Sequence, residues 1–251
     1  MDVKRKPFQG VYNIIRFNWH FYFISGLTLV CLVIFKHHLP EFMHPFAFGF
    51  TLLGVLALSV SLLISFYIYD LSDLYHLKGL KNTDEGRLLN INAGFDEISE
   101  IIKTRFPKIE LTICDFYNAE KHTEISIQRA RKAYPPINGT FHVSTHKLPF
   151  KDNSFEYALA QLSAHEIRDS RERVQFFKEL NRVTKTTGLI LVTEHLRDWN
   201  NFMVYSIGFF HFHSKSDWLE TFKEANLKIK SETKVTPFIT TFTLENNGDT
   251  F

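Results

Sequence analysis

Two short segments carry adjacent acidic and imidazole side chains, which are groups that proteins use for proton transfer. His165 and Glu166 are neighbours in the segment 161–167, and Glu194 and His195 end a later apolar run. An unperturbed imidazole titrates near neutral pH, so His165 can act as a general base beside Glu166. The alternative is an architectural pair, because base catalysis needs a substrate geometry that a sequence does not show. For Glu194 and His195 the alternative is a capping or loop role.

No metal site is predicted. His211 and His213 are spaced like neighbours on one face of a strand, but no cysteine or carboxylate cluster in the sequence completes a ligand set beside them. Cys31 lies in an apolar run and Cys114 ends a predicted strand, so they indicate neither a disulfide framework nor a thiolate metal site. The catalytic part is therefore expected in a reducing compartment.

A polar turn follows the apolar run 88–91. In the segment LLNINAGFDE, Gly94 lies between Asn92 and Asp96. Small residues at such a turn let the backbone approach a ligand at the carboxyl end of a parallel sheet. Asparagine reaches left-handed backbone angles more readily than most residues, so Asn92 is compatible with the turn. Asp96 lies near the start of a predicted helix, where its carboxylate can cap the helix or meet the ammonium group of a cofactor.

Strand and helix patterns alternate after residue 86, which predicts a parallel sheet with crossover helices. Helix 171–184 is amphipathic, since Val174, Phe177, Leu180 and Val183 recur at helical spacing. Gly188 is expected to form a turn before the following strand. The expected strands are 88–91, 109–114, 139–143, 157–161 and 189–193, the expected helices are 96–104, 123–133 and 171–184, and segments 227–233 and 239–244 are expected to form a terminal antiparallel pair.

The segment 148–194 resembles the second half of a class I S-adenosylmethionine-dependent methyltransferase domain of the methyltransferase type 11 kind. It reads LPFKDNSFEYALAQLSAHEI, followed by RERVQFFKELNRVTKTTGLILVTE. The resemblance covers residues 82–244. It implies an α/β fold with a Rossmann-like sheet of seven strands, mostly parallel with an antiparallel last strand, and S-adenosylmethionine as the cofactor. Phe155 is then a core residue.

The same resemblance assigns roles at the first turn. Members of this family usually carry an acidic residue there, followed by three alternating glycines. In this chain Asn90 replaces the acid, Asn92 and Asp96 stand at the outer glycine positions, and Gly94 remains.

Later positions receive cofactor roles in the same way. Asp115 falls where a carboxylate accepts hydrogen bonds from ribose hydroxyls, with a solvated loop acid as the alternative. Ser144 stands where many relatives carry an aspartate that contacts the adenine amino group, and its hydroxyl can still form a hydrogen bond. Gln161 is placed beside the cofactor, and His165 with Glu166 begins the region that follows.

Two apolar runs near the N-terminus predict a transmembrane hairpin. Residues 19–35 and 42–69 contain no Asp, Glu, Lys or Arg, and roughly 20 apolar residues suffice to cross a bilayer. We expect helices at about 19–36 and 46–69, separated by a short connection that contains Pro40 and Pro45. The alternatives are a cleaved signal peptide for the first run and a buried helix of a soluble protein for either run.

Basic residues near the runs predict the orientation. Lys36 is the basic residue of the connecting loop, whereas several Lys and Arg residues flank the outer ends of the hairpin, so both termini are expected in the cytoplasm, with a bacterial inner membrane as the simplest setting. These flanking residues are Lys4, Arg5, Lys6, Arg16, Lys78 and Lys81. The expected domains are a cytoplasmic segment 1–18, the hairpin 19–69, a linker 70–86 and a methyltransferase-like domain 87–251.

Composition agrees with one soluble domain and a short membrane part, since 45% of the residues are hydrophobic and 22% are charged. The net charge of +2 gives no support for a nucleic-acid partner. The segment 199–213 is rich in aromatic residues, which favour either an entrance for a lipophilic molecule at an interface or ordinary core packing.

Methyl transfer from a sulfonium mainly requires that acceptor, methyl group and sulfur be aligned and that water be excluded. The expected function is therefore methylation of a lipophilic small molecule at the membrane, such as a lipid, a quinone-like ring or an aryl-polyene precursor. The alternative is a methyltransferase-like pseudoenzyme that acts as a membrane-tethered binding or scaffold module, which the altered first turn motivates.

Overall fold

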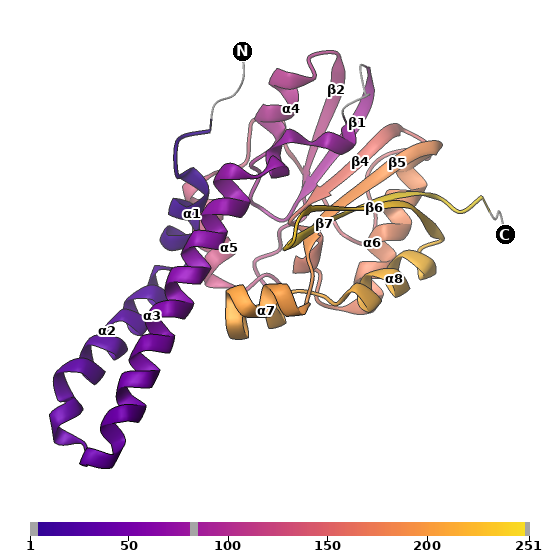
Figure 1. Ribbon diagram of the computed structural model, residues 1–251. Coiled ribbons are helices and arrows are strands. Elements are labelled where there is room, and N and C mark those ends of the chain that lie inside the picture. Colours follow the sequence, from indigo (N-terminus) through magenta and orange to yellow (C-terminus); the bar gives the residue numbers. More distant parts are fainter. Residues whose placement is uncertain (1–4, 81–84, 249–251) are drawn as a thin grey trace.

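The computed structural model describes residues 5–80 and 85–248. A seven-stranded sheet flanked by helices forms the body, and two long helices extend from it as a hairpin (Figure 1). The order of the strands in the sheet is β3-β2-β1-β4-β5-β7-β6. The strands are β1 Gly86–Asn92, β2 Ile109–Asp115, β3 Phe141–His142, β4 Phe155–Gln161, β5 Thr184–His195, β6 Leu227–Thr236 and β7 Ile239–Asn246.

Pairing directions confirm the predicted Rossmann-like sheet. Strands β3, β2, β1, β4 and β5 pair in parallel, and β7 is antiparallel to both β5 and β6. Strand β3 is only two residues long, where the sequence predicted five at 139–143. Because the central strands are parallel, their carboxyl ends meet at one edge of the sheet, and this edge carries the polar residues singled out above.

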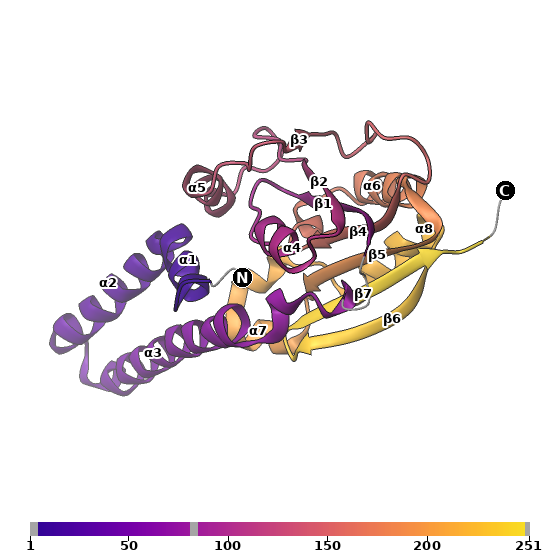
Figure 2. The same cartoon turned by 90° about the horizontal axis from the view of Figure 1, so that it is seen from above.

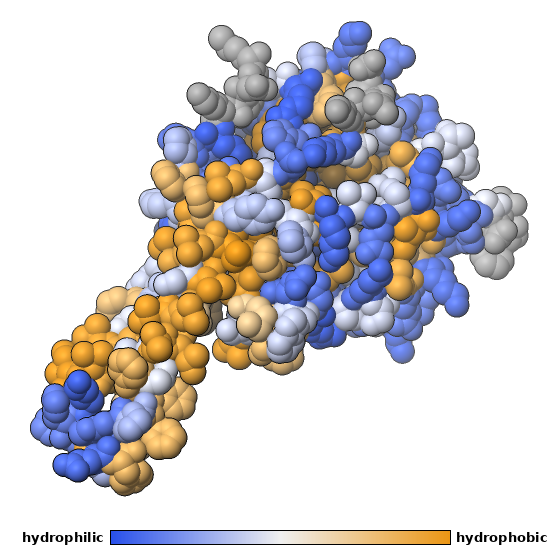
Figure 3. Space-filling view, in the orientation of Figure 1, coloured by the Kyte–Doolittle hydropathy of each residue, from blue (hydrophilic) through white to orange (hydrophobic). Residues whose placement is uncertain are grey.

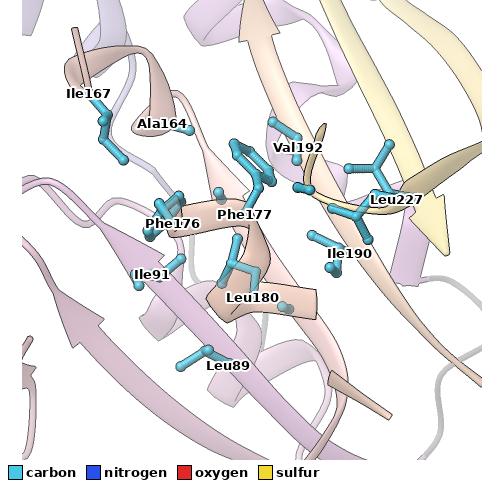
Figure 4. Packing of buried hydrophobic residues seen from close by; sticks show 14 of the residues in the cluster. Leu89, Ile91, Ala164, Ile167, Phe176, Phe177, Leu180, Ile190, Val192 and Leu227 are labelled. Carbon is cyan, nitrogen blue, oxygen red and sulfur yellow. The ribbon is translucent and has the colours of Figure 1, made fainter. Parts of the chain in front are cut away.

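The two faces of the sheet bury separate hydrophobic clusters. Helices α6 Ser170–Val183 and α8 Lys215–Glu224 cover one face, where Phe177 and Leu180 of α6 pack with strand residues (Figure 4). Helix α4 Ser99–Arg105 and the short helices η4 Asp73–His76 and η5 Lys78–Leu80 cover the other face. Side chains alternate between the faces along a strand, so Leu88 joins the second cluster and Leu89 the first.

The hairpin consists of α2 Trp19–Phe35 and α3 His44–Phe66, with the short helices η1 Lys36–His38 and η2 Glu41–Met43 between them. Helix α2 buries none of its residues, and α3 buries only Ala47 and Ser65 against the described chain. The hairpin surface is largely apolar, with polar residues at its tip (Figure 3). Within residues 5–80 and 85–248, two helices are long and apolar enough to cross a membrane, a property that a signal sequence or the core helix of a soluble protein can share.

Several elements differ from the sequence predictions. Helix α1 Gln9–Phe17 was not predicted, and it lies between the hairpin and α5 Ile125–Ala133 (Figure 2). Helices α7 Trp199–Tyr205 and α8 were also missed. The expected linker 70–86 is not a free connection, because Leu74, Leu77 and Leu80 are buried against the sheet.

Two more expectations need correction. Gly188 does not form a turn but lies inside β5, where a Cβ atom would come within 2.7 Å of the Glu156 carbonyl oxygen. His211 and His213 do not lie on a strand, since the 3₁₀ helix η7 Ser206–His211 ends between them. Lys4 and Lys81 of the charge count, and residue 82 at the start of the resemblance, lie outside the described residues.

Candidate active site

The first turn of the sheet adopts a conformation that requires glycine. Gly94 has a φ of +93°, and its amide donates to Asn92 Oδ1 at 2.9 Å. A Cβ atom at Gly94 would lie 2.8 Å from a guanidinium nitrogen of Arg131 and 3.0 Å from Tyr117 Cβ. A side chain at this position would therefore be strained and would also collide with its surroundings.

Asp96 caps the following helix and keeps one oxygen free. Its Oδ1 atom accepts from the amides of Ile98 and Ser99, each at 3.0 Å, which is the capping role considered above. Its Oδ2 atom is buried and has no hydrogen-bond partner among the described residues. Asn90 lies beneath the turn and donates to Ser99 Oγ at 2.8 Å, and its Oδ1 atom is likewise buried and unpaired within that part of the chain. Such orphaned oxygens suit a ligand that carries donors.

Asp115 is a buried carboxylate and not a solvated loop acid. It pairs in register with Asn92 across β1 and β2, so both stand at the carboxyl edge of the sheet. Its Oδ1 atom accepts from the Tyr117 amide at 2.8 Å, and its Oδ2 atom accepts from the guanidinium group of Arg131. The Arg131 guanidinium also lies over the Tyr117 ring, 4.7 Å from its centre. Arg131 was missed by the sequence reasoning.

Residues of the turn line a small cavity of about 10 Å³. Its volume is about that of one water probe, so the wall formed by Tyr134, Pro135 and Pro136 would have to move for S-adenosylmethionine to enter. These acceptors nevertheless fit a cofactor that carries hydrogen-bond donors, because the buried carboxylate of Asp115, the turn at Gly94 and the unpaired Oδ2 atom of Asp96 surround one space. The lining residues are Asn92, Gly94, Asp96, Asp115, Tyr134, Pro135, Pro136 and Thr140.

Three predicted cofactor residues do not line this cavity, and Asn90, which lies beneath the turn, is one of them. Ser144 lies in an exposed turn, where its hydroxyl accepts from the His146 amide at 3.2 Å. Gln161 is half-buried at the end of β4. A larger open groove of about 480 Å³ lies near Asn181 and Asn246, toward the amino end of β5. Ligands of open α/β sheets bind at the carboxyl edge, so we place the site at the small cavity.

His165 is fixed by Glu194 at the same edge. Glu194 is fully buried, and its Oε2 atom lies 2.6 Å from His165 Nδ1. The other oxygen of Glu194 accepts from the amides of Ser163 and His165, each at 3.2 Å. Glu194 thus orients the His165 ring, and His165 Nε2 remains directed to Glu166 Oε1 at 3.6 Å.

His211 approaches the same pair from η7. Its Nδ1 atom lies 2.7 Å from Glu124 Oε1, and its Nε2 atom lies 3.7 Å from Glu166 Oε1. Burial alone would lower the pKa of His211, but the bonds to Glu124 and Glu166 outweigh it and raise that pKa to about 9. Burial would raise the pKa of Glu166, yet His211 and His165 hold it at about 2. Glu124 and His211 were not predicted in this cluster.

His195 follows Glu194 at the end of β5, but its ring contacts Tyr69 and Asn201. It is buried, with Nδ1 2.9 Å from Asn201 Oδ1 and Nε2 2.8 Å from the Tyr69 hydroxyl. Burial lowers its pKa to about 4, so the ring is neutral at physiological pH. His195 therefore joins the sheet to the base of the hairpin and to α7.

Comparisons with known proteins agree with this geometry. Residues 93–192 match the family described as "Methyltransferase domain". The fold is similar to that of the PH0226 protein from Pyrococcus horikoshii OT3, with 16% identity, a TM-score of 0.51, and coverage of 69% of this chain and 88% of that one. A SAM-dependent methyltransferase from Aquifex aeolicus is 13% identical, with a TM-score of 0.49 over 69% of this chain and 89% of that one. Curated proteins gave no match. Residues 93–192 are therefore similar to a methyltransferase domain.

Proposed function

We propose that this protein is a membrane-anchored S-adenosylmethionine-dependent methyltransferase that acts on a lipophilic small molecule. The cofactor assignment rests on the turn at Gly94, the buried carboxylate of Asp115 and the unpaired oxygen of Asp96. In the proposed complex Asp115 accepts from the ribose and Asp96 faces the ammonium group. The bound cofactor would supply an electrophilic methyl group, and the chain would align the acceptor with it.

One observation carries the membrane part of the proposal: the exposed apolar surfaces of the hairpin and of α7 with η7 are adjacent. Trp199 and Ile207 expose 70% and 80% of their surface, and Met203 and Phe210 are exposed as well. Helix α7 packs beside α3 at the base of the hairpin (Figure 1). Exposed apolar patches of this kind mark membrane or partner surfaces. Aromatic side chains also favour the headgroup zone.

The same segment leads directly to the cluster at the carboxyl edge. Phe210 is exposed, and His211, the next residue, lies against Glu166. A lipophilic acceptor that enters along η7 would therefore meet His165 and Glu166 first. We propose that these two side chains bind and orient the polar group of the acceptor, while a general-base role for His165 remains a prediction.

Calorimetric titration of S-adenosylmethionine into the detergent-purified protein tests the cofactor site. We expect binding by the wild type and its loss in Gly94→Arg, whose side chain would fill the cavity. Absence of binding by a folded wild-type sample would contradict the enzymatic function. Transfer of a labelled methyl group to a lipid extract in vesicles then tests the acceptor class, with Ile207→Ser expected to slow transfer without changing cofactor affinity.

A second candidate is a methyltransferase-like module that binds a partner without catalysis. The contact between Arg131 and Asp115, together with a cavity of only about 10 Å³, favours this alternative. Failure of the wild type to bind the cofactor, combined with an undisturbed fold, would support it over the enzyme.

A further inference from the structure

Three side chains at the carboxyl edge form a compact set of metal-ligand atoms. Among the described residues, His165, Glu166 and His211 each offer one ligand atom, and these atoms lie within 4.8 Å of one another. The two measured separations from Glu166 Oε1 are 3.6 Å to His165 Nε2 and 3.7 Å to His211 Nε2. Ligand atoms of a tetrahedral Zn²⁺ site stand about 3.3 Å apart, given bonds of about 2.0–2.1 Å. A contraction of a few tenths of an ångström would thus bring these two pairs to coordination distance, whereas the two histidine nitrogens, which lie within 4.8 Å of each other, would have to close by up to about 1.5 Å.

The second nitrogen of each histidine is already held by a carboxylate. Glu194 Oε2 lies 2.6 Å from His165 Nδ1, and Glu124 Oε1 lies 2.7 Å from His211 Nδ1. Metal-bound histidines almost always donate their other ring nitrogen to such a group, which fixes the ring and raises the basicity of the ligand atom. Both rings therefore present Nε2 to the centre of the cluster.

The backbone around the ligands is also tied together. The guanidinium of Arg168 donates to the carbonyl oxygens of His165 and His211, which lie in two 3₁₀ helices 46 positions apart in the sequence. The three ligand side chains are 11%, 10% and 22% exposed, so the cluster is sheltered but solvent can reach it. An ion can thus enter without unfolding of the site.

We propose that His165 Nε2, Glu166 Oε1 and His211 Nε2 bind a divalent transition-metal ion of the Zn²⁺ type. Two imidazoles and one carboxylate suit Zn²⁺ or Fe²⁺ and leave at least one coordination position open. That position would take water or an oxygen of a bound molecule. This differs from the sequence prediction of no metal, which considered His211 with His213, whereas the fold brings His211 to His165 and Glu166. The site shares His165 and Glu166 with the acceptor site of the proposed function, but metal binding itself requires no S-adenosylmethionine.

Zn²⁺ titration of the full chain tests the site. The protein is purified in detergent with a tag that contains no histidine, stripped with a chelator and titrated calorimetrically, with Co²⁺ absorption as a second readout of ligand geometry. We expect one tight site per chain, weakened at least 100-fold in Glu166→Gln and in His211→Gln. His146→Gln is the matched control, because His146 is exposed on the same domain and stands outside the cluster.

Two further variants keep the outcome decisive. Glu124→Gln alters only the carboxylate behind His211, on a side chain that is about half exposed, and is expected to weaken Zn²⁺ binding 10- to 100-fold while the protein stays folded. His37→Gln accounts for adventitious binding at the hairpin loop, where His37 and His44 lie close together. Equal Zn²⁺ affinity in the wild type, Glu166→Gln, His211→Gln and Glu124→Gln would overturn the proposal, as would no binding by folded wild type. The titration contains no S-adenosylmethionine, so its result is separable from that of the Gly94→Arg experiment.

Discussion

The contact between Arg131 and Asp115 predicts that removal of the arginine tightens cofactor binding. The Asp115 side chain is 3% exposed and that of Arg131 is 28% exposed, so the pair is mostly shielded from water. A hydrogen bond to a charged group is worth about 1.5–3 kcal/mol, and the lower value applies because Arg131 retains contact with solvent. In the proposed complex, ribose binding by Asp115 would replace this bond in the wild type. In Arg131→Met that cost is absent, and the dissociation constant of S-adenosylmethionine should fall about tenfold.

Calorimetric titration of both proteins measures the difference, and Lys132→Met is the control, because Lys132 is exposed on the same helix. The ligand-free Arg131→Met protein should also unfold at a lower temperature than the wild type, since Asp115 loses a charged partner. The cofactor should then raise its unfolding temperature by more than it raises that of the wild type. Weaker binding by Arg131→Met would refute the reasoning and would mean that Arg131 contacts the cofactor directly.

Three other predictions concern stability and reactivity. His195 has a pKa of about 4 when folded and 6.5 as its ordinary value, so the unfolded state binds more protons between these pH values. Acidification from pH 6.5 to 4 should therefore remove about 3 kcal/mol of stability, and thermal unfolding of His195→Gln in detergent should show a shallower loss over this range. Phe177→Ala should cost about 3–5 kcal/mol in urea unfolding, because the ring is fully buried between α6 and α8. Burial raises the pKa of Cys114 to about 12, so a maleimide at pH 7 should leave Cys114 unmodified until the protein unfolds.

The sheet was predictable because its signals are local. Apolar runs of strand length alternate with amphipathic helices, and Phe177, Leu180 and Val183 of α6 are buried as their spacing predicted. Helix α1 does carry an amphipathic pattern, which the sequence reasoning missed, but its buried positions include Gly10 and Asn13, which an apolar pattern does not mark. Its hydrogen-bond partners Arg129 and Tyr134 lie more than 100 residues later in the sequence, and the residues of α1 alone do not predict these contacts.

The site was predictable in part for the same reason. Asp115 ends strand β2, Gly94 and Asp96 follow the end of β1, and strand ends can be located from sequence. Arg131 and His211 reach the site from α5 and η7, so only the folded chain brings them to Asp115 and Glu166. The two basic residues in the last turn of α5 were a weak signal for Arg131, and the aromatic run 199–213 concealed His211. Ser144 was placed at the site by resemblance, yet its turn is exposed.

Helix α1 has a consequence for the speed of cofactor exchange. Arg129 of α5 donates to the Phe17 carbonyl at 2.7 Å, and the Tyr134 hydroxyl, at the end of α5, donates to Asn13 at 3.0 Å. Tyr134 also lines the cofactor cavity, and Asp70 below the hairpin accepts from the Gly10 amide. The side of the cavity that contains Tyr134 is thus connected by hydrogen bonds to α1, and through α1 to the base of the hairpin at Asp70. In the proposed membrane setting, the tilt of the hairpin, and hence the thickness of the bilayer around it, would set the residence time of the spent cofactor.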